Sequence, residues 1–327
     1  MENGDFKHRL KQKDLVAMLF ILFSEEYDRS QADSITDITL PMASIRDYIQ
    51  KKTGVAYSND AWITTQIHKY EEELGIALFC KTASASGSML GLCKDISTYE
   101  QKRHLYITQK IRTANGVFDL IKNSLEDPSS ERAVSILLEA GSTVTRVAEI
   151  IAQNLTTSPL GWDIHTNNLG VIECLGKTSP AFSKVALSVP SGRFNPATNL
   201  ILGEDLDLYR DKEFDWIIQG TSFLSGGILY VERADEARLK SRILHECRGK
   251  KVLVLTGHEA TAHPKAGIAS FGSAGDYDYI IHPALPPESA AARRLWAELS
   301  GSGIPSLSVM IRNWSYQILV PQILFSL

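Results

Sequence analysis

A short loop, Gly141-Ser142-Thr143, combines residue types that can hold an anion. It lies between a predicted strand and a predicted helix, so its backbone N–H groups, its two hydroxyl groups and the helix N-terminus can bind a phosphate. Farther along the chain, Asn167 can donate to and accept from sugar hydroxyls, and Arg193 or Lys240 can balance the charge of an anion. The alternatives are a surface ion pair for Arg193 and a turn-forming role for Asn167.

A second candidate surface lies on a predicted helix at about residues 60–74. Apolar residues repeat there at three-to-four spacing from Ile63 to Leu74, and Gly75 is a typical helix end. The opposite face is polar and can meet DNA bases and phosphates, although periodicity alone favours an ordinary solvated face. The candidate DNA contacts are Asn59, Thr64, Thr65, Gln66, His68 and Lys69.

The second half of the chain must position the first set of residues. After residue 132, short β-rich runs alternate with amphipathic segments, which predicts a mostly parallel sheet with helices on its faces. Such sheets bind ligands at the carboxyl ends of their strands. The predicted strands are 134–138, 161–165, 184–189, 215–219, 251–256 and 277–282, and the predicted helices are 144–154, 169–175 and 234–247.

The first half of the chain is predicted to be largely helical, with helices at 13–23, 42–52 and 60–74 and a wing or loop at 83–103. A helix with one apolar stripe follows at 106–125, then a polar linker at 126–131. Near the end, 290–299 is predicted as a helix and the apolar segment 318–327 as a packing or oligomer-contact strand. The predicted domains are 1–104, a linker helix and linker at 105–131, 132–285, and a helix with tail at 286–327.

Composition sets broad limits on function. The chain has 327 residues, 44% of them hydrophobic and 22% charged, which suits about two globular domains. The net charge of −4 gives no bulk attraction to nucleic acid or to an anionic membrane. The apolar run 15–23 is too short to span a bilayer, and its charged leader is unlike a signal peptide. The cysteines, which have neither zinc nor disulfide-framework spacing and favour a cytoplasmic protein, are Cys80, Cys93, Cys174 and Cys247.

Motifs for catalysis and cofactors are weak in this sequence. A sugar isomerase needs a carboxylate base; Glu139, Asp215 and Glu232 are available, but their spacing is equally typical of strand-end and helix-capping residues. His258 and His263 are five residues apart, unlike a helical zinc pair. Neither a Gly-x-x-x-x-Gly-Lys-Ser/Thr loop nor a Gly-x-Gly-x-x-Gly fingerprint occurs. The expectation is therefore a protein with no catalytic residues, metal or cofactor.

The segment 62–79 resembles the recognition-helix region of LysR-type transcription regulators. Gln66, Ile67, Glu71, Leu74, Gly75, Leu78 and Phe79 match that family's pattern, whereas Thr64, Thr65 and Tyr70 replace its usual Ser, Arg and Leu. The resemblance covers about a fifth of the chain. It implies a winged helix-turn-helix that reads double-stranded DNA as a two-fold dimer, with 106–125 as the dimerising helix.

The region 133–283 resembles the sugar-phosphate sensor domain of DeoR-type regulators, which is related in fold to ribose-5-phosphate isomerase and the CoA transferases. The matching segments, in order, are 138–143, 166–168, 190–193 with Gly203, 215–220, 226–227 and 236–240. Residues 257–260 depart from the family, which places a lysine there. The ligand-binding residues implied are Glu139, Gly141, Ser142, Thr143, Thr166, Asn167, Gly192, Arg193, Gly220, Thr221, Gly226, Gly227 and Lys240.

Together these observations predict an α/β sensor domain with a mostly parallel sheet, preceded by a helical winged helix-turn-helix domain and a long linker helix. The expected protein is a cytoplasmic transcriptional regulator that binds DNA and a small phosphorylated sugar or related anion. It is expected to be a homodimer or higher homo-oligomer without membrane contact. The alternative is a sugar-phosphate isomerase or transferase-like enzyme with an accessory winged-helix module.

Overall fold

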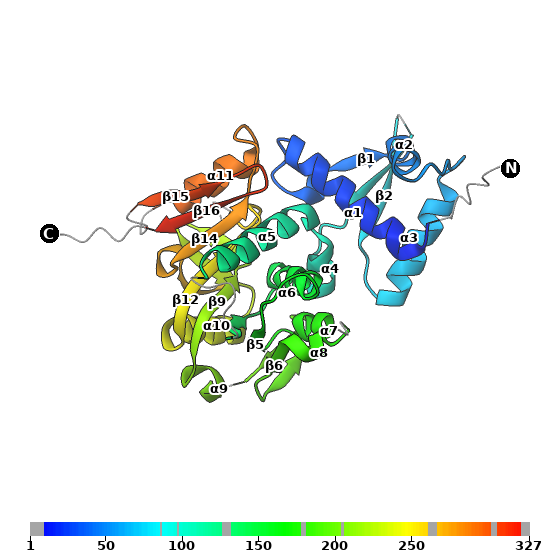
Figure 1. Cartoon of the computed structure of the whole chain (residues 1–327). Coiled ribbons are helices and arrows are strands. Elements are labelled where there is room, and N and C mark those ends of the chain that lie inside the picture. Colours follow the sequence, from blue (N-terminus) through cyan, green and yellow to red (C-terminus); the bar gives the residue numbers. More distant parts are fainter. Residues whose placement is uncertain are drawn as a thin grey trace. The chain divides into compact units, whose positions relative to one another are not determined.

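The computed structural model describes residues 10–85, 87–96, 98–125, 132–177, 181–203, 206–260, 267–301 and 306–321. The chain forms two compact units, Met1–Thr108 and Gln109–Leu327 (Figure 1). The second unit includes both the helix predicted as a linker and the residues after 285, because both pack on one sheet. The predicted linker 126–131 and the end of the tail, 322–327, lie outside the described residues.

The first unit combines helices with a small antiparallel sheet of order β1-β3-β2. Helices form at all three predicted places, and a further short helix, α4, was not predicted. The elements are α1 (Gln12–Arg29), η1 (Ile35–Asp37), β1 (Thr39–Pro41), α2 (Met42–Thr53), α3 (Ala61–Leu74), β2 (Phe79–Ser84), β3 (Gly87–Leu92) and α4 (Tyr99–His104).

The core of the first unit follows from the apolar spacing of its helices. Each helix buries apolar side chains in this core. Leu15 and Leu19, one turn apart on α1, are fully buried, and so are Ile45 of α2 and Ile63 of α3. Both α2 and α3 end at a glycine in the left-handed conformation, the backbone region that side chains disfavour. The core therefore fixes which face of α3 remains outside.

The second unit is a mixed α/β structure around a large, mostly parallel sheet, as predicted. Within the described residues the sheet order is β15-β16-β14-β12-β9-β4-β5-β6; the six strands from β14 to β6 are parallel, and β16 and β15 add an antiparallel edge. The strands of this sheet are β4 (Val134–Leu138), β5 (Trp162–Thr166), β6 (Val185–Ser188), β9 (Glu213–Gly220), β12 (Arg248–Val254), β14 (Tyr279–Pro283), β15 (Leu307–Arg312) and β16 (Tyr316–Pro321).

Helices cover both faces of the sheet. Alternate residues of β4 divide between two cores: Ile136 and Leu138 pack with α5, α6 and α7, whereas Leu137 packs with α9 and α10. The helices of this unit are α5 (Ile107–Asn123), α6 (Ser142–Asn154), α7 (Leu169–Gly176), α8 (Ala181–Lys184), α9 (Asp207–Arg210), α10 (Ala234–Glu246), η2 (Ala274–Asp276) and α11 (Ala290–Leu299).

Helix α5 packs directly against the sheet of its own unit. Val117 and Ile121 are fully buried in the larger core. Gly116 lies so close to the sheet that an added Cβ would be 2.8 Å from Ile281 and 2.9 Å from the ring of Tyr316. The apolar stripe of α5 thus packs in large part on β14 and β16, while Ile111 of the same helix is exposed.

Smaller sheets complete the unit. Strands β7 (Arg193–Asn195) and β8 (Leu200–Leu202) form a hairpin, and β10 (Phe223–Ser225), β11 (Ile228–Val231) and β13 (Ala269–Ser273) form a three-stranded sheet. Sequence patterns predicted none of these short strands. Among the described residues, no helix is both long enough and apolar enough to cross a membrane.

Candidate functional site

The carboxyl ends of the parallel strands gather polar residues at one edge of the sheet. Glu139 follows β4, Thr166 ends β5 and Asn167 follows it, and Gly220 ends β9. Because Leu138 pairs with Thr166, Glu139 and Asn167 lie at the ends of neighbouring strands. The exposed fraction of Glu139, Thr166 and Asn167 is 0%, so this edge of the sheet holds a buried polar cluster.

A buried ion pair lies at the centre of this cluster. Lys240 of α10 extends its ammonium group to the carboxylate of Glu139, and its Nζ also donates to the carbonyl oxygen of Gly220 at 3.1 Å. The side chain of Lys240 is 2% exposed and that of Glu139 is 0% exposed. The sequence analysis expected Lys240 to balance the charge of a ligand, but Glu139 already does this for Lys240.

Burial raises the pKa of Glu139 above its usual value, and the ammonium group of Lys240 opposes this shift. Next to the pair, Gln219 donates from Nε2 to the carbonyl oxygen of Lys240 at 3.2 Å and accepts from the hydroxyl of Tyr277 at 2.9 Å. Burial, with the charge of Glu139 as the second cause, raises the pKa of Tyr277, so this hydroxyl remains protonated. Gln219 and Tyr277 were missed in the sequence because Gln219 falls at an unspecified position of the 215–220 segment and Tyr277 belongs to no recognisable motif.

Three polar atoms of the cluster have no hydrogen bond of good geometry among the described residues, although the Asn167 side chain lies close enough to Glu139 to lower the pKa of that carboxyl. They are Oε1 of Glu139 and the two side-chain atoms of Asn167, all buried. Buried polar atoms are nearly always paired, and leaving one unpaired costs about 1–3 kcal/mol. A bound molecule with its own donors and acceptors would satisfy them.

The neighbouring Asn168 has a structural role. Its Oδ1 accepts from the backbone N–H of Gly170 at 3.0 Å, which caps α7, and its Nδ2 donates to the carbonyl oxygen of Gly141 at 3.1 Å. The Thr166 hydroxyl donates to the carbonyl oxygen of Leu138 at 2.6 Å and accepts from the N–H of Asn168. The predicted ligand residue Thr166 is therefore used to join the β4 and β5 loops.

The predicted anion loop lies at the start of α6. Gly141 has φ of 119°, which favours glycine, and it places Ser142 as the first residue of the helix. Ser142 is half-buried and Thr143 is 8% exposed. The first N–H groups of a helix have no partner within it, so this turn can accept an anion beside Asn167.

Two other predicted ligand segments have structural explanations. A Cβ on Gly192 would lie 2.5 Å from the carbonyl oxygen of Leu202, so glycine there allows the close approach of the β7–β8 hairpin. Arg193 is exposed at the start of β7. The hairpin is joined to the site because the N–H of Ile201 donates to the carbonyl oxygen of Asn167 at 2.8 Å.

The glycines at 226 and 227 form the two-residue turn between β10 and β11, with φ of 55° and 80°. The N–H of Gly226 donates to Oε2 of Glu298 on α11 at 2.6 Å. The Thr221 hydroxyl donates within the same small sheet, 2.9 Å from the carbonyl oxygens of Phe223 and Tyr230. Thr221 and Gly226 thus have partners in the small sheet and in α11.

The loop after β12 is organised by an acidic residue that sequence reasoning did not single out. Glu259, 2% exposed, accepts from the N–H groups of Thr256 at 3.0 Å and Gly257 at 2.8 Å. His258 lies beside it, 3.6 Å from Glu259 Oε1. The Glu259 carboxylate therefore stabilises the loop by binding the backbone N–H groups of the loop itself. His263 lies outside the described residues.

The polar face of α3 is largely accessible. Thr65, His68 and Lys69 are exposed, and Thr64 and Gln66 are half-buried. The Thr64 hydroxyl donates back to the carbonyl oxygen of Asp60 at 3.0 Å, so it has a helical partner. The last predicted DNA contact, Asn59, accepts from the N–H of Ala61 at 3.1 Å and so helps to begin α3.

The turn after α3 is held by a side-chain contact. Glu71 Oε1 accepts from the N–H groups of Leu78 at 2.7 Å and Phe79 at 2.8 Å. Gly75, in the left-handed conformation, reverses the chain between them. Oε1 of this carboxylate therefore points into its own turn, whereas Oε2 lies 3.6 Å from Nδ1 of His68 on the polar face of α3.

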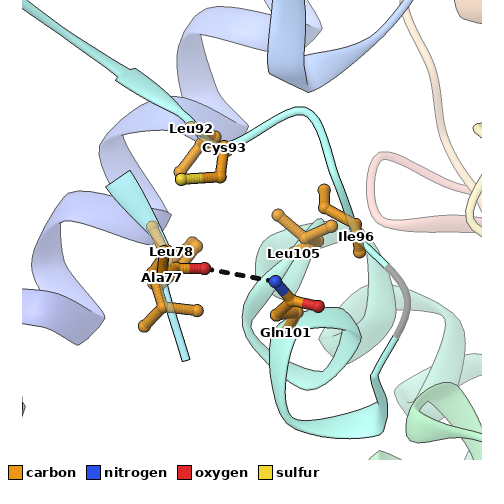
Figure 2. Close-up of a pocket in the computed structure, with 8 residues that line it drawn as sticks. Ala77, Leu78, Leu92, Cys93, Ile96, Gln101 and Leu105 are labelled. Atoms are coloured by element: carbon orange, nitrogen blue, oxygen red, sulfur yellow. Dashed lines mark hydrogen bonds between the residues drawn. The ribbon is translucent and has the colours of Figure 1, made fainter. Parts of the chain in front are cut away.

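A small crevice in the first unit is lined by Cys93, whose sulfur lies close to that of Cys80. Figure 2 shows it beside the end of the hairpin, with Gln101 donating to the carbonyl oxygen of Ala77 at 3.1 Å. Its volume of about 10 Å³ holds about one water molecule at most. Cys80 and Cys93 have their Sγ atoms 3.1 Å apart, and burial raises the pKa of Cys93 to about 12. The sequence analysis did not predict this proximity, because the two cysteines are thirteen positions apart in the chain.

No family model and no curated protein matches this chain. Similar solved structures include ribose 5-phosphate isomerase A from Methanocaldococcus jannaschii, with a TM-score of 0.31 and 12% identity, covering 64% of this chain and 77% of that chain. Ribose 5-phosphate isomerase A from Neisseria gonorrhoeae has a TM-score of 0.30 and 12% identity, covering 71% and 81%. The delta subunit of eIF2B from Chaetomium thermophilum has a TM-score of 0.35 and 9% identity, covering 85% and 92%. At such TM-scores these likenesses support no functional argument, and the site is interpreted from its own residues.

Proposed function

We propose that the protein is a DNA-binding transcriptional regulator whose second unit senses a small phosphorylated sugar or a related anion. One observation carries the sensing role: Glu139 and Asn167 hold buried polar atoms without a hydrogen bond of good geometry beside the first turn of α6. The turn would take the phosphate, with the hydroxyls of Ser142 and Thr143 as further donors. The Asn167 amide would bind sugar hydroxyls.

The charge of the ligand would be met by the helix terminus, because Lys240 is already paired with Glu139. Arg193 is the remaining cation on a segment joined to Asn167, through the β7–β8 hairpin. This assignment predicts that a neutral sugar binds more weakly than its phosphate.

Thermal unfolding with a panel of sugar phosphates and free sugars tests the sensing role, since a ligand of the folded state raises its stability. We expect a rise in melting temperature with a phosphorylated compound and its loss in Ser142→Ala/Thr143→Ala. Ser158→Ala, which alters a half-buried serine away from the strand ends, is the control. An equal response in the double variant and the wild type would contradict the assignment.

The DNA-binding role is supported by the order of elements in the first unit. Helix α1, strand β1, helices α2 and α3 and the β2–β3 hairpin follow one another along the chain, and in the proposed winged helix α3 would take the recognition position. The polar face of α3 would enter the major groove, and the exposed hairpin residues, including Lys81, would form the wing. The resemblance of 62–79 to LysR-type regulators supports the same role.

Binding to random-sequence duplex DNA across a salt series tests this role. Affinity should fall steeply with salt, and Gln66→Ala/Lys69→Ala should weaken binding and reduce the salt slope by about one phosphate contact. Lys122→Ala removes an exposed lysine from the second unit and is the control. Unchanged DNA affinity in the α3 variant would argue against a recognition role for α3.

One observation favours a second candidate function, a sugar-phosphate isomerase or transferase-like activity. Burial raises the pKa of Glu139, as is common for carboxylates that act as acid or base, and its Oε1 has no hydrogen bond of good geometry among the described residues. Turnover of ribose 5-phosphate that disappears in Glu139→Gln and does not depend on DNA would favour this function. Binding without turnover would favour the sensor.

A further inference from the structure

A groove in the second unit lies apart from the cluster around Glu139. It has a volume of about 590 Å³, within the range of sites for small molecules. Strands β14, β15 and β16 and helix α11 contribute its walls. Its lining includes His282, Leu285, Leu295, Trp296, Arg312 and Gln317.

Three of these residues form a row across the antiparallel edge of the sheet. His282 of β14 pairs with Gln317 of β16, and Gln317 pairs with Arg312 of β15. Directly paired residues project from the same face of a sheet. Ile281 and Ile318 belong to the core on the opposite face, so the row faces α11.

Two buried atoms of this row lack partners among the described residues. His282 is 1% exposed, and its Nδ1 donates to the carbonyl oxygen of Pro283 at 2.8 Å, which leaves Nε2 as an acceptor. Nε2 of His282 and Oε1 of Gln317 have no hydrogen bond. Burial lowers the pKa of His282 to about 4, so the ring is neutral at pH 7. The groove therefore offers two adjacent acceptors.

The rest of the groove defines what would satisfy these acceptors. Leu285, Leu295 and Trp296 provide an apolar and aromatic wall for a planar ring. Arg312 is exposed at the end of the row, and the described residues provide it with no ion-pair partner. A glutamine amide, with one acceptor and two donors, matches an amino group beside a ring nitrogen, as in adenine.

We propose that this groove binds an adenine nucleotide, with the exocyclic amino group donating to Gln317 and His282 and a phosphate paired with Arg312. The site is additional to the proposed sugar-phosphate site, since none of the residues that line it belongs to the cluster around Glu139. Arginine suits the phosphate because its planar group can donate two hydrogen bonds at once.

Calorimetric titration of the full chain with adenosine monophosphate tests the proposal. We expect saturable binding, with adenosine weaker than adenosine monophosphate. Gln317→Leu and Arg312→Ala should each lower the affinity about tenfold, the effect of losing a hydrogen bond to a charged or buried partner. Arg312 is exposed, so its variant tests the site even if Gln317→Leu fails to fold.

Two controls separate this groove from the first site. Arg248→Ala removes an exposed arginine at the amino end of β12 and should leave binding unchanged. Ser142→Ala/Thr143→Ala should also bind adenosine monophosphate normally, whatever it does to sugar phosphates. The proposal is overturned if adenosine monophosphate does not bind, if Arg312→Ala binds like the wild type, or if only the Ser142/Thr143 variant loses binding.

Discussion

The pairing of Glu139 with Lys240 places opposite charges in a part of the molecule that excludes water. Removing charges from water is costly, and their attraction offsets this cost only while both partners are present. The pair therefore orders α10 against the ends of β4 and β9, where Lys240 also binds Gly220. The Asn167 side chain also lowers the pKa of this carboxyl, although Oε1 of Glu139 makes no hydrogen bond of good geometry among the described residues.

Lys240→Met should lower the free energy of unfolding by about 3–5 kcal/mol, because it leaves Glu139 as an uncompensated buried charge. Urea unfolding at neutral pH measures the change. The double variant Glu139→Gln/Lys240→Met should recover much of the loss, and Lys122→Met on the surface of α5 should change stability little. Equal stabilities for Lys240→Met and Lys122→Met would contradict the buried pair.

His282 gives the stability of the fold a pH dependence. Burial lowers its pKa from the usual 6.5 to about 4, with Glu259 opposing the shift and Arg312 reinforcing it. The unfolded chain therefore binds a proton below pH 6.5 that the folded chain does not bind until about pH 4. Between these values the fold should lose about 3 kcal/mol as the pH falls. Urea unfolding should show a smaller loss over this interval in His282→Gln; an identical profile would contradict the prediction.

In the first unit, side-chain hydrogen bonds to the backbone join neighbouring elements, in addition to apolar packing. The turn after α3 depends on Glu71, which satisfies two backbone N–H groups at the start of β2. The adjacent Glu72 and Glu73 are exposed. An acidic run that looks uniform in sequence thus divides into one structural and two solvated residues.

Glu71→Ala should destabilise the first unit by about 1–3 kcal/mol, since the N–H groups of Leu78 and Phe79 lose their acceptor. Thermal or urea unfolding measures this loss. Glu72→Ala removes the same side chain from an exposed position and should change stability by less than about 0.5 kcal/mol. A ratio near one between the two effects would refute the structural role of Glu71.

Helix α5 depends on a glycine at its contact with the sheet. Gly116→Ala should be destabilising by about 1–3 kcal/mol despite the better helix propensity of alanine, because the methyl group meets Ile281 and Tyr316. Gly176→Ala, at the end of α7, meets nothing within 4 Å and should be neutral or stabilising by up to about 1 kcal/mol. Urea unfolding of both variants and the wild type measures the sign of each change in the free energy of unfolding. A stabilising Gly116→Ala would contradict the close packing of α5.

At the scale of the whole molecule, the proposed DNA-binding face and the proposed ligand sites lie in different units. A regulator requires that binding in one unit changes affinity in the other, by a coupling free energy of about 1–3 kcal/mol in typical cases. Such coupling is reciprocal, which makes it measurable from either side.

We expect saturating sugar phosphate to change the affinity for DNA about fivefold or more, and DNA to change the affinity for sugar phosphate by the same factor. Fluorescence anisotropy with labelled duplex, with and without ligand, measures the first effect, and calorimetry measures the second. Ser142→Ala/Thr143→Ala should abolish the effect while leaving DNA affinity intact. Identical DNA affinity in both ligand states would rule out the regulatory coupling.

The sequence by itself determined the individual helices and strands, because apolar periodicity and helix-ending residues are local properties of the chain. The strands at 134–138 and 215–219, the helix at 144–154 and the ends at Gly54 and Gly75 follow from alternating or helical apolar spacing and from glycine at helix ends. The parallel sheet follows from the alternation of strands and helices. That order also placed Glu139, Asn167 and the start of α6 at one edge.

Only the tertiary structure decided which polar residues meet and which have structural partners. It paired Lys240 with Glu139 across 101 positions, brought Cys80 beside Cys93, and used Gly226 and Gly227 for a turn. It also packed much of the stripe of α5 on β14 and β16, and it aligned His282, Gln317 and Arg312 across three strands. Spacing along a chain cannot determine these contacts, because they depend on strand order and register, which the packing of the whole core selects.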